Sequence, residues 1–252
     1  MINWAPLRQA LADSRAAGMR VPVWWRDDDA TEPTSALDRL ERLSRELGIP
    51  VHLAIVPKHA SHALAEYVAR TDAFESLVHG WAHTNHAGPN EKKSEFGAPR
   101  DSGRAELHEG FQRSMALFSK KPLPVFVPPW NRMDDSYFDA LAATGYRALS
   151  SFSPRTSVIA FPNLARINCH IDPIDWRGTR GLVAPEQIIE TAVARIRARL
   201  DGSEDSLEPM GYLTHHLVHT AEIWEFSASF LNELLQGGAV IQPLSPLLEQ
   251  PE

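Results

Sequence analysis

The sequence has a single cysteine, Cys169, so it cannot form an internal disulfide. No apolar run approaches the roughly 18 residues that a membrane-spanning helix needs. The opening segment, MINWAPLRQALADSRAAG, has no apolar core of the signal-peptide type. We therefore expect a cytoplasmic protein with no membrane span.

Basic side chains are outnumbered, with 25 Lys and Arg against 32 Asp and Glu, for a formal net charge of −7. A duplex-binding protein usually carries a basic face, so we expect no nucleic-acid partner, although a local patch stays open. The sequence also lacks the Gly-x-Ser-x-Gly pattern of a serine hydrolase and the glycine-rich loop of a phosphate-binding site. It indicates no oligomeric state.

Short apolar runs alternate with helical patterns along the 252 residues. The expected strands are 21–25, 51–56, 74–78, 124–127, 146–150, 165–169, 212–214 and 239–241. The expected helices are 2–17, 34–47, 59–70, 106–118, 134–144, 185–200 and 221–235. Strands that are mostly followed by helices predict an α/β protein with a parallel sheet or barrel. We expect residues 1–252 to form one barrel domain, with a helix in residues 1–20 packed on the barrel.

Acidic, histidine and tryptophan residues follow several of these strands. They lie in the segments 27–29, 79–83, 128–132, 170–176 and 215–216. In parallel barrels and sheets the site lies at the carboxyl ends of the strands, so these side chains are predicted to converge on one mouth. The long polar segment after His79, with Lys92, Lys93 and Arg100, is either a solvated loop or one that closes over the site and contacts an anionic substrate.

One carboxylate and two histidines can bind a divalent metal such as Zn²⁺ with a position left open for water. A second carboxylate can then act as general base, and another histidine can protonate the leaving group. Each motif alone has an ordinary structural explanation. An Asp triplet can cap a helix, Pro-Pro-Trp can form a packed turn, Cys169 can be a buried apolar side chain, and His52 can be hydrogen-bonded within its strand. Their joint placement favours a site.

In chain order the motifs are an acidic pair, His-x-x-x-His, Pro-Pro-aromatic, Asp-x-x-Asp-Trp and Leu-x-His. This order resembles the polysaccharide deacetylase superfamily (the NodB-homology domain, of carbohydrate esterase type) from about Val21 to His216. The resemblance implies a distorted (β/α)7-type barrel that hydrolyses acetyl groups with one divalent metal. We expect Zn²⁺, with Co²⁺, Ni²⁺ and Mn²⁺ as alternatives.

The resemblance also implies the metal ligands, which are Asp29, His79 and His83, with Gly80 in place of the family's serine. Asp28 becomes the general base. A shift by one residue, which would make Asp27 the base and Asp28 the ligand, stays open because three aspartates are consecutive.

The later motifs supply the remaining roles by resemblance. His215 becomes the general acid, oriented by Asp175. The substrate-binding residues are Pro129, Trp130, Arg132, Trp176 and Leu213. In these roles Trp130 lines the groove and offers its backbone N–H to the oxyanion, and Leu213 contacts the acetyl methyl. The family's arginine that pairs with the base is Val127 here, so Arg26 or Arg132 is expected to replace it.

The predicted function is removal of an acetyl or similar acyl group from an N-acylated, sugar-containing substrate by attack of metal-bound water. The partner is then a small molecule or a saccharide. One alternative is a non-catalytic barrel that binds a metal or ligand. Another is a metal-dependent amide hydrolase acting on a small non-sugar compound. A third is a phosphoesterase in which His215, His216 and His219 supply further ligands for a second metal.

Overall fold

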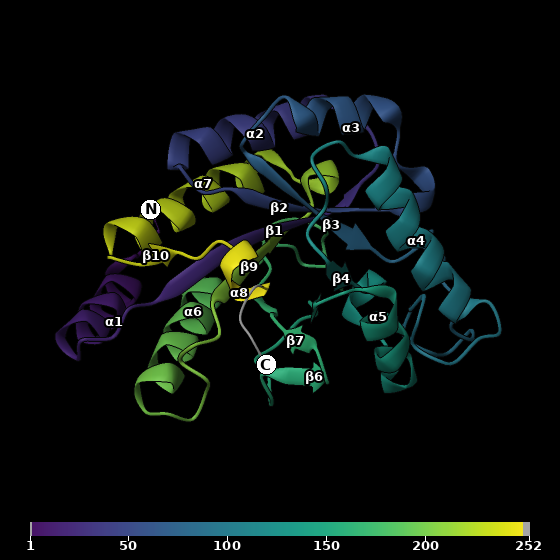
Figure 1. Ribbon diagram of the computed structural model, residues 1–252. Coiled ribbons are helices and arrows are strands. Elements are labelled where there is room, and N and C mark those ends of the chain that lie inside the picture. Colours follow the sequence, from purple (N-terminus) through teal and green to yellow (C-terminus); the bar gives the residue numbers. More distant parts are fainter. Residues whose placement is uncertain (1, 249–252) are drawn as a thin grey trace.

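A mostly parallel sheet forms the centre of the molecule in the computed structural model, which describes residues 2–248 (Figure 1). Its strands are β1 (Pro22–Ala30), β2 (Val51–Ile55), β3 (Phe74–His79), β4 (Val125–Val127), β5 (Ala148–Leu149), β6 (Ile159–Phe161), β7 (Leu164–Arg166), β8 (Cys169–Ile171), β9 (Met210–Thr214) and β10 (Val240–Ile241). The order is β6-β7-β5-β4-β3-β2-β1-β9-β8, and β10 pairs with the start of β1. Among the pairs of these strands, only β6–β7 is antiparallel.

The two ends of this strand order come back together. A parallel bridge joins Phe152, just after β5, to Cys169 at the start of β8. The Cys169 N–H donates to Ser151 O, and the Ser153 N–H donates to Cys169 O. The sheet therefore curls into a distorted barrel, which confirms the predicted fold class.

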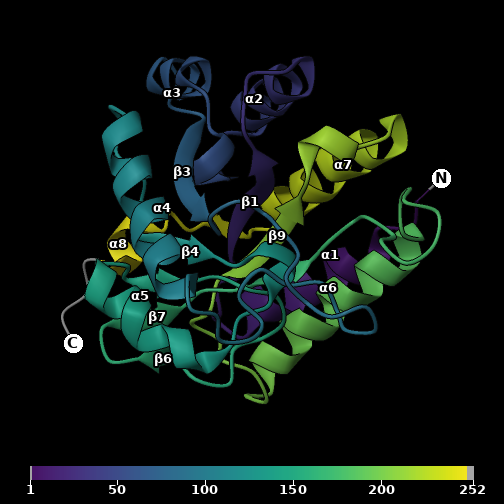
Figure 2. The same ribbon diagram turned by 90° about the vertical axis from the view of Figure 1, so that its right-hand side faces the viewer.

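Helices surround the sheet (Figures 1 and 2). They are α1 (Ala5–Ala16), α2 (Ser35–Leu47), α3 (His62–Ala69), α4 (Gly103–Leu117), α5 (Phe138–Thr144), α6 (Pro185–Leu200), α7 (Ala221–Gln236) and α8 (Ser245–Leu248). In α2 the Thr34 side chain accepts from the Leu37 N–H, and Gly48, with φ of +67°, ends the helix. The first helix, α1, packs on α6 and α7 with Leu7 and Leu11 buried. Among residues 2–248, no helix is both long and apolar enough to cross a membrane.

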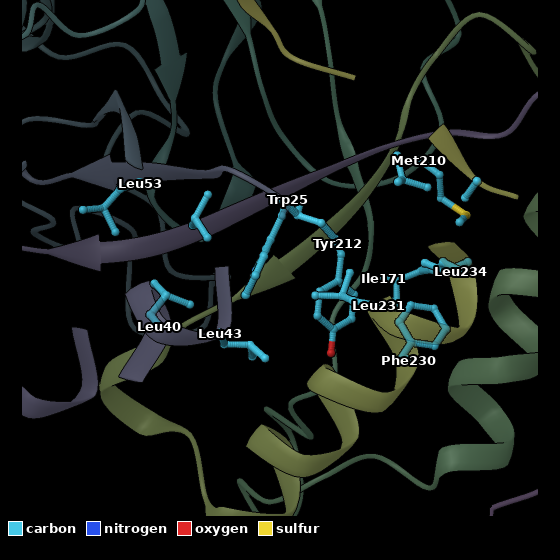
Figure 3. Close-up of a cluster of buried hydrophobic side chains, with 14 of the residues drawn as sticks. Trp25, Leu40, Leu43, Leu53, Ile171, Met210, Tyr212, Phe230, Leu231 and Leu234 are labelled. Carbon is cyan, nitrogen blue, oxygen red and sulfur yellow. The ribbon is translucent and has the colours of Figure 1, made fainter. Parts of the chain in front are cut away.

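Strand β1 separates two parts of the core, because successive side chains point to opposite faces of the sheet. Trp24 packs in the barrel interior with residues such as Val127, Cys169 and Leu213. Trp25 faces outward, toward the helices, in the cluster drawn in Figure 3. Both indoles are buried and donate hydrogen bonds, to Asn168 O at 3.2 Å and to Thr214 Oγ1 at 2.8 Å. The alternation of β1 thus decides which of its residues can reach the interior.

The predicted end of the first strand was wrong. We expected it to stop at Trp25, but β1 continues to Ala30 and includes all three aspartates. Charged residues can extend a buried strand only when each finds a partner, and Arg26, Asp27 and Asp28 all do. The expected strand 165–169 is likewise divided into β7 and β8, and the short strand β6 was not predicted.

Candidate metal and catalytic site

The first aspartate of β1, Asp27, points away from the barrel interior. Its carboxylate lies 2.5 Å from Nδ1 of His216 and also accepts from Thr214 Oγ1 at 2.6 Å and the His216 N–H at 3.0 Å. Burial opposes ionisation of Asp27, but the adjacent His216 ring lowers the pKa of the carboxyl overall. Asp27 is therefore occupied in a buried ion pair, and Asp28 and Asp29 are the aspartates that reach the mouth.

A β-bulge turns Asp29 toward the same site as Asp28. Strict alternation would place Asp29 on the face of Asp27, but the register between β1 and β2 shifts between Asp27 and Ala30. Asp29 has φ of +76°, a left-handed conformation that aspartate tolerates better than most residues. Its Oδ1 lies 3.1 Å from Nε2 of His79 and 3.2 Å from Nε2 of His83. The bulge thus places two consecutive carboxylates at one mouth.

These three side chains form a set that fits a divalent metal. One ligand atom from each lies within 4.8 Å of the others, and this is the one such trio found within residues 2–248. Two nitrogen or oxygen ligands at about 2.0–2.1 Å from a tetrahedral ion lie roughly 3.3 Å apart, close to the separations of Asp29 from the two rings. His79, at the end of β3, donates from Nδ1 to Val127 O at 2.9 Å, which leaves the Nε2 lone pair for a metal.

The protonation states of Asp29 and His83 also suit a metal. Burial opposes ionisation of Asp29, but the hydrogen bond from His79 and the charge of that ring outweigh it, so the pKa of Asp29 is lowered. Burial lowers the pKa of His83, and the neighbouring His79 lowers it further. The site therefore favours an ionised Asp29 carboxylate and a neutral His83 ring, and both are forms that bind metal. Burial opposes protonation of His79, but the charge of Asp28 and the hydrogen bond to Asp29 raise the pKa of that ring, so an ion would have to displace a proton from its Nε2.

The next carboxylate, Asp28, is held by an arginine from its own strand. Nε and Nη2 of Arg26 lie 2.9 and 3.0 Å from the two carboxylate oxygens. Nη1 donates to Ser150 O at 3.1 Å and Ser150 Oγ at 2.9 Å, and Nη2 also donates to Asn131 Oδ1 at 2.6 Å. Of the two arginines expected to replace the one missing at position 127, Arg26 is the one that pairs with Asp28, since Arg132 donates to Lys93 O at 2.8 Å.

The predicted acid, His215, follows β9 and faces Asp28. Its Nε2 lies 4.0 Å from Oδ2 of Asp28, and the Trp176 indole meets its ring edge-on with centroids 4.7 Å apart. Leu213, two residues earlier, is 1% exposed and lies deep in the barrel interior. The structure thus brings the predicted base and acid together and places Leu213 beneath them.

The structure does not bring Asp175, the predicted partner of His215, to that histidine. Both Asp175 oxygens accept N–H groups of its own turn, from Gly178 at 3.0 Å and Thr179 at 2.9 Å. The aspartate linked to His215 is Asp172, which directly follows β8 and accepts from the Trp176 indole N–H at 2.8 Å; that indole in turn packs edge-on against the His215 ring. Burial raises the pKa of Asp172. The sequence pattern contained both aspartates, and the expectation chose the wrong one for this contact.

Exchanging each of these aspartates for asparagine distinguishes them. Asp172→Asn replaces the carboxylate that holds the Trp176 indole against His215 by a neutral amide, so we expect kcat to fall roughly ten- to hundredfold. Asp175→Asn disturbs only a turn and should leave kcat within twofold of wild type. The measurement is steady-state hydrolysis, by both variants, of the N-acylated substrate class that the motif order predicts. Equal losses, or a larger loss for Asp175→Asn, would contradict this assignment.

Around the mouth, the Pro-Pro-Trp motif forms a turn directly after β4. Pro129 is buried, and Trp130 has φ of +56° with its ring 4.3 Å from that of His83. Next to it lies a pocket of about 540 Å³ whose lining includes Asn131, Arg132 and Lys92. Asn131 also accepts from Arg26, so the pocket adjoins the Asp28 side of the site.

The long polar segment that follows β3 is anchored in the protein at residues 94–96. Lys92 and Lys93 are exposed, but Ser94, Glu95 and Phe96 are buried, and Arg100 pairs with Glu106. The predicted solvated loop is therefore correct only for its outer part. The buried Glu95 was not identified from the sequence, because nothing in the local pattern distinguishes it from Glu91.

The remaining histidines do not form a second metal site in the part of the chain that the structure describes. His216 is paired with Asp27, and His219 Nε2 accepts from the His215 N–H at 3.4 Å. Burial lowers the pKa of His219 to about 4. His52 is buried with Nδ1 3.1 Å from Trp25 O, and burial raises the pKa of the Cys169 thiol to about 12, as expected for structural residues.

Comparison with known proteins agrees with this arrangement at the level of the fold. No family model matches the sequence, and no curated protein matches it. Among solved structures, a Mycobacterium smegmatis protein assigned to the polysaccharide deacetylases superposes with a TM-score of 0.65 at 18% identity, over 92% of this chain and 90% of that chain. A family 4 carbohydrate esterase from Streptomyces lividans, in complex with acetate, gives 0.56 at 15% identity, over 91% and 95%.

A family 4 acetyl xylan esterase from Clostridium thermocellum, in complex with a cobalt ion, gives a TM-score of 0.52 at 15% identity, over 89% of each chain. The chain thus has the fold of the family 4 polysaccharide deacetylases across most of its length, as the motif order predicted, at low sequence identity.

Proposed function

We propose that this protein is a metal-dependent deacetylase that removes an acetyl or similar acyl group from an N-acylated sugar. The observation that carries the proposal is the placement of Asp28 and His215 facing each other beside the Asp29–His79–His83 trio. A base, an acid and a candidate metal site within one mouth are the parts that hydrolysis of an amide requires. The neighbours of known fold support the same chemistry, since the Streptomyces lividans structure holds acetate.

Asp29, His79 and His83 would hold the ion, for which we propose Zn²⁺. A divalent ion in such a site supplies Lewis acidity, which polarises a carbonyl and lowers the pKa of a bound water. Asp28 accepts the proton of the attacking water, with its orientation fixed by the two contacts from Arg26. His215 then gives a proton to the departing amine. The Trp130 ring lies 4.3 Å from that of His83, and the backbone N–H of Trp130 would donate to the developing oxyanion.

The substrate's sugar would lie between aromatic rings at the rim. Trp176 is 37% exposed above His215, and Trp130 stands on the His83 side. Such faces stack on the apolar face of a sugar ring. Pro129 shapes the turn beneath, and the part of the substrate beyond the acetylated ring would extend into the pocket beside Arg132. Because Leu213 is buried, it would pack beneath the acyl group and would not form part of the exposed surface.

The missing arginine of the third motif favours the non-catalytic alternative slightly, and Arg26 supplies a contact to Asp28 in its place. A small non-sugar amide stays a second candidate substrate, and the substrate screen below includes it.

Metal content of the purified protein tests the proposal first. We expect about one equivalent of a divalent ion in the wild type and its loss in His79→Ala, because the remaining two ligands cannot hold the ion tightly. His108→Ala, an exposed histidine on α4, is the matched control and should keep the metal. Elemental analysis is followed by a screen of N-acetyl sugars and small amides. Absence of metal after reconstitution with Zn²⁺ would overturn the proposed mechanism.

A further inference from the structure

We infer that Glu95 is a positioning residue for the metal site, because it holds the turn that carries His83. The inference rests on the proposed metal site. Glu95 is 1% exposed, although it belongs to the long polar loop. Its Oε2 accepts the N–H of Trp81 at 3.0 Å, and Oε1 accepts the N–H of Ala82 at 2.8 Å and of Thr84 at 3.3 Å. One carboxylate thus binds three N–H groups on both sides of His83.

The turn between His79 and His83 needs such support, because it belongs to no helix or strand. Gly80 has φ of +59° and His83 has φ of +54°. A left-handed conformation at a residue other than glycine is strained and persists only when surrounding contacts impose it. The hydrogen bonds from Ala82 and Thr84 hold the backbone immediately before and after His83. They therefore fix the direction in which its ring points toward Asp29.

The glycine at position 80 fits this carboxylate. A Cβ at Gly80 would lie 2.2 Å from Oε2 of Glu95 and 2.5 Å from Cγ of Pro129. The space that a side chain would fill at Gly80 is therefore already taken by Glu95. Glu95 can therefore occupy this position only because the second residue of the His-x-x-x-His motif is glycine.

Glu95 is itself firmly anchored. The next residue, Phe96, is fully buried, stacks edge-on against Phe126 and Tyr137, and accepts from the Asp134 N–H at 2.8 Å. The preceding Ser94 accepts from the His86 N–H at 2.9 Å. This part of the loop connects the hydrophobic core to the His83 turn, so a change at Glu95 acts directly on the metal ligand.

The carboxylate also contributes negative charge near the site. Within residues 2–248 Glu95 forms no salt bridge; backbone N–H groups contact its carboxylate directly, and Arg100 and His83 interact with its charge at longer range. A cation bound by His83 would lie close to this charge and be stabilised by it. Charge and position therefore both favour metal binding.

The test is the dissociation constant of Zn²⁺, measured by competition with a chelating indicator. Glu95→Gln replaces one acceptor oxygen by an NH₂ group that opposes the backbone donors, and it removes the charge. We expect Zn²⁺ to bind at least tenfold more weakly, in line with the ten- to hundredfold effects of residues that orient metal ligands. Glu91→Gln is the matched control, since Glu91 is exposed in the same loop and accepts from the Gly88 N–H at 3.0 Å. It should bind Zn²⁺ as the wild type does.

Unchanged Zn²⁺ affinity in Glu95→Gln would overturn the inference and leave the proposed function intact. A wild-type protein that binds no Zn²⁺ would overturn both. If Glu95→Gln does not fold, Glu95→Asp takes its place, because it keeps the charge but withdraws the oxygens from the turn. A tenfold weaker Zn²⁺ affinity of folded Glu95→Asp supports the inference, and wild-type affinity overturns it.

Discussion

Replacing Asp28 by asparagine is expected to lower kcat by about 10²–10⁴-fold, the usual contribution of a general base, while metal content stays at the wild-type level. Asparagine has nearly the same shape as aspartate and keeps one oxygen to accept from Nη2 of Arg26, whose contact is 3.0 Å in the wild type. It cannot take a proton from water. The measurement is kcat on the N-acetyl substrate found in the screen, together with elemental analysis of the same preparation.

Two further variants distinguish loss of the base from loss of the metal and from a nonspecific effect of replacing an aspartate. Asp29→Asn should lose metal and activity together, because Asp29 belongs to the trio with His79 and His83. Asp175→Asn serves as the control for an aspartate near the mouth whose carboxylate is held in its own turn. If Asp28→Asn retains a tenth or more of wild-type kcat, Asp28 is not the base.

A change at the neighbouring Asp27 is expected to act on stability. The Asp27 carboxylate and the His216 ring are both fully buried and 2.5 Å apart. Asp27→Asn removes one partner and leaves the other without a counter-charge, which costs about 3–5 kcal/mol of unfolding free energy for buried pairs. In a domain of this size the Tm should fall by roughly 6–20 °C. Asp139→Asn is the matched control, because Asp139 pairs with Arg104 on the surface and its loss should leave Tm unchanged.

The difference in Tm between wild type and Asp27→Asn depends on pH because the pKa values of Asp27 and His216 are both shifted. Burial opposes the shift of each group, but the partner's charge lowers the pKa of Asp27 and raises that of His216. Asp27 contributes stability above its ordinary pKa of 3.8, and this contribution is lost as the pH falls through the lowered value. His216 contributes fully below its ordinary pKa of 6.5, and this is lost as the pH rises through the raised value.

The difference in Tm between wild type and Asp27→Asn should therefore be largest between pH 3.8 and 6.5 and shrink toward alkaline pH. Thermal unfolding of both proteins across pH 4–9 measures it. A difference that grows with rising pH would contradict an ion pair and indicate a neutral hydrogen bond instead.

Much of this architecture could be predicted from the pattern of residues. Apolar runs followed by helical periodicity predicted a parallel sheet, and the rule that sites lie at strand ends identified His79, His83, Asp28 and His215. What failed was local geometry. Alternation along β1 would separate Asp28 from Asp29, and only the bulge, which depends on pairing with β2, brings them to one mouth.

Other parts of the site could not be predicted because they depend on contacts between distant segments. Asp172 and Asp175 lie three positions apart in one motif, and which of them turns inward depends on where β8 ends, a boundary set by pairing with β9. Glu95 contacts a turn that lies more than ten residues earlier in the chain. No short sequence pattern encodes such a contact, because it exists only once Phe96 is packed in the core.

The arginine of β1 also constrains how this sequence can diverge. Arg26 occupies both oxygens of Asp28, and Val127, where the family's pattern has its arginine, is fully buried in the apolar interior. An arginine added at 127 would bury a second guanidinium with no free carboxylate, and loss of Arg26 alone would leave Asp28 unpaired; either step is costly. Evolutionary exchange between the two arrangements therefore requires paired substitutions. Related chains should carry an arginine two residues before the base or one before the Pro-Pro turn, but not both.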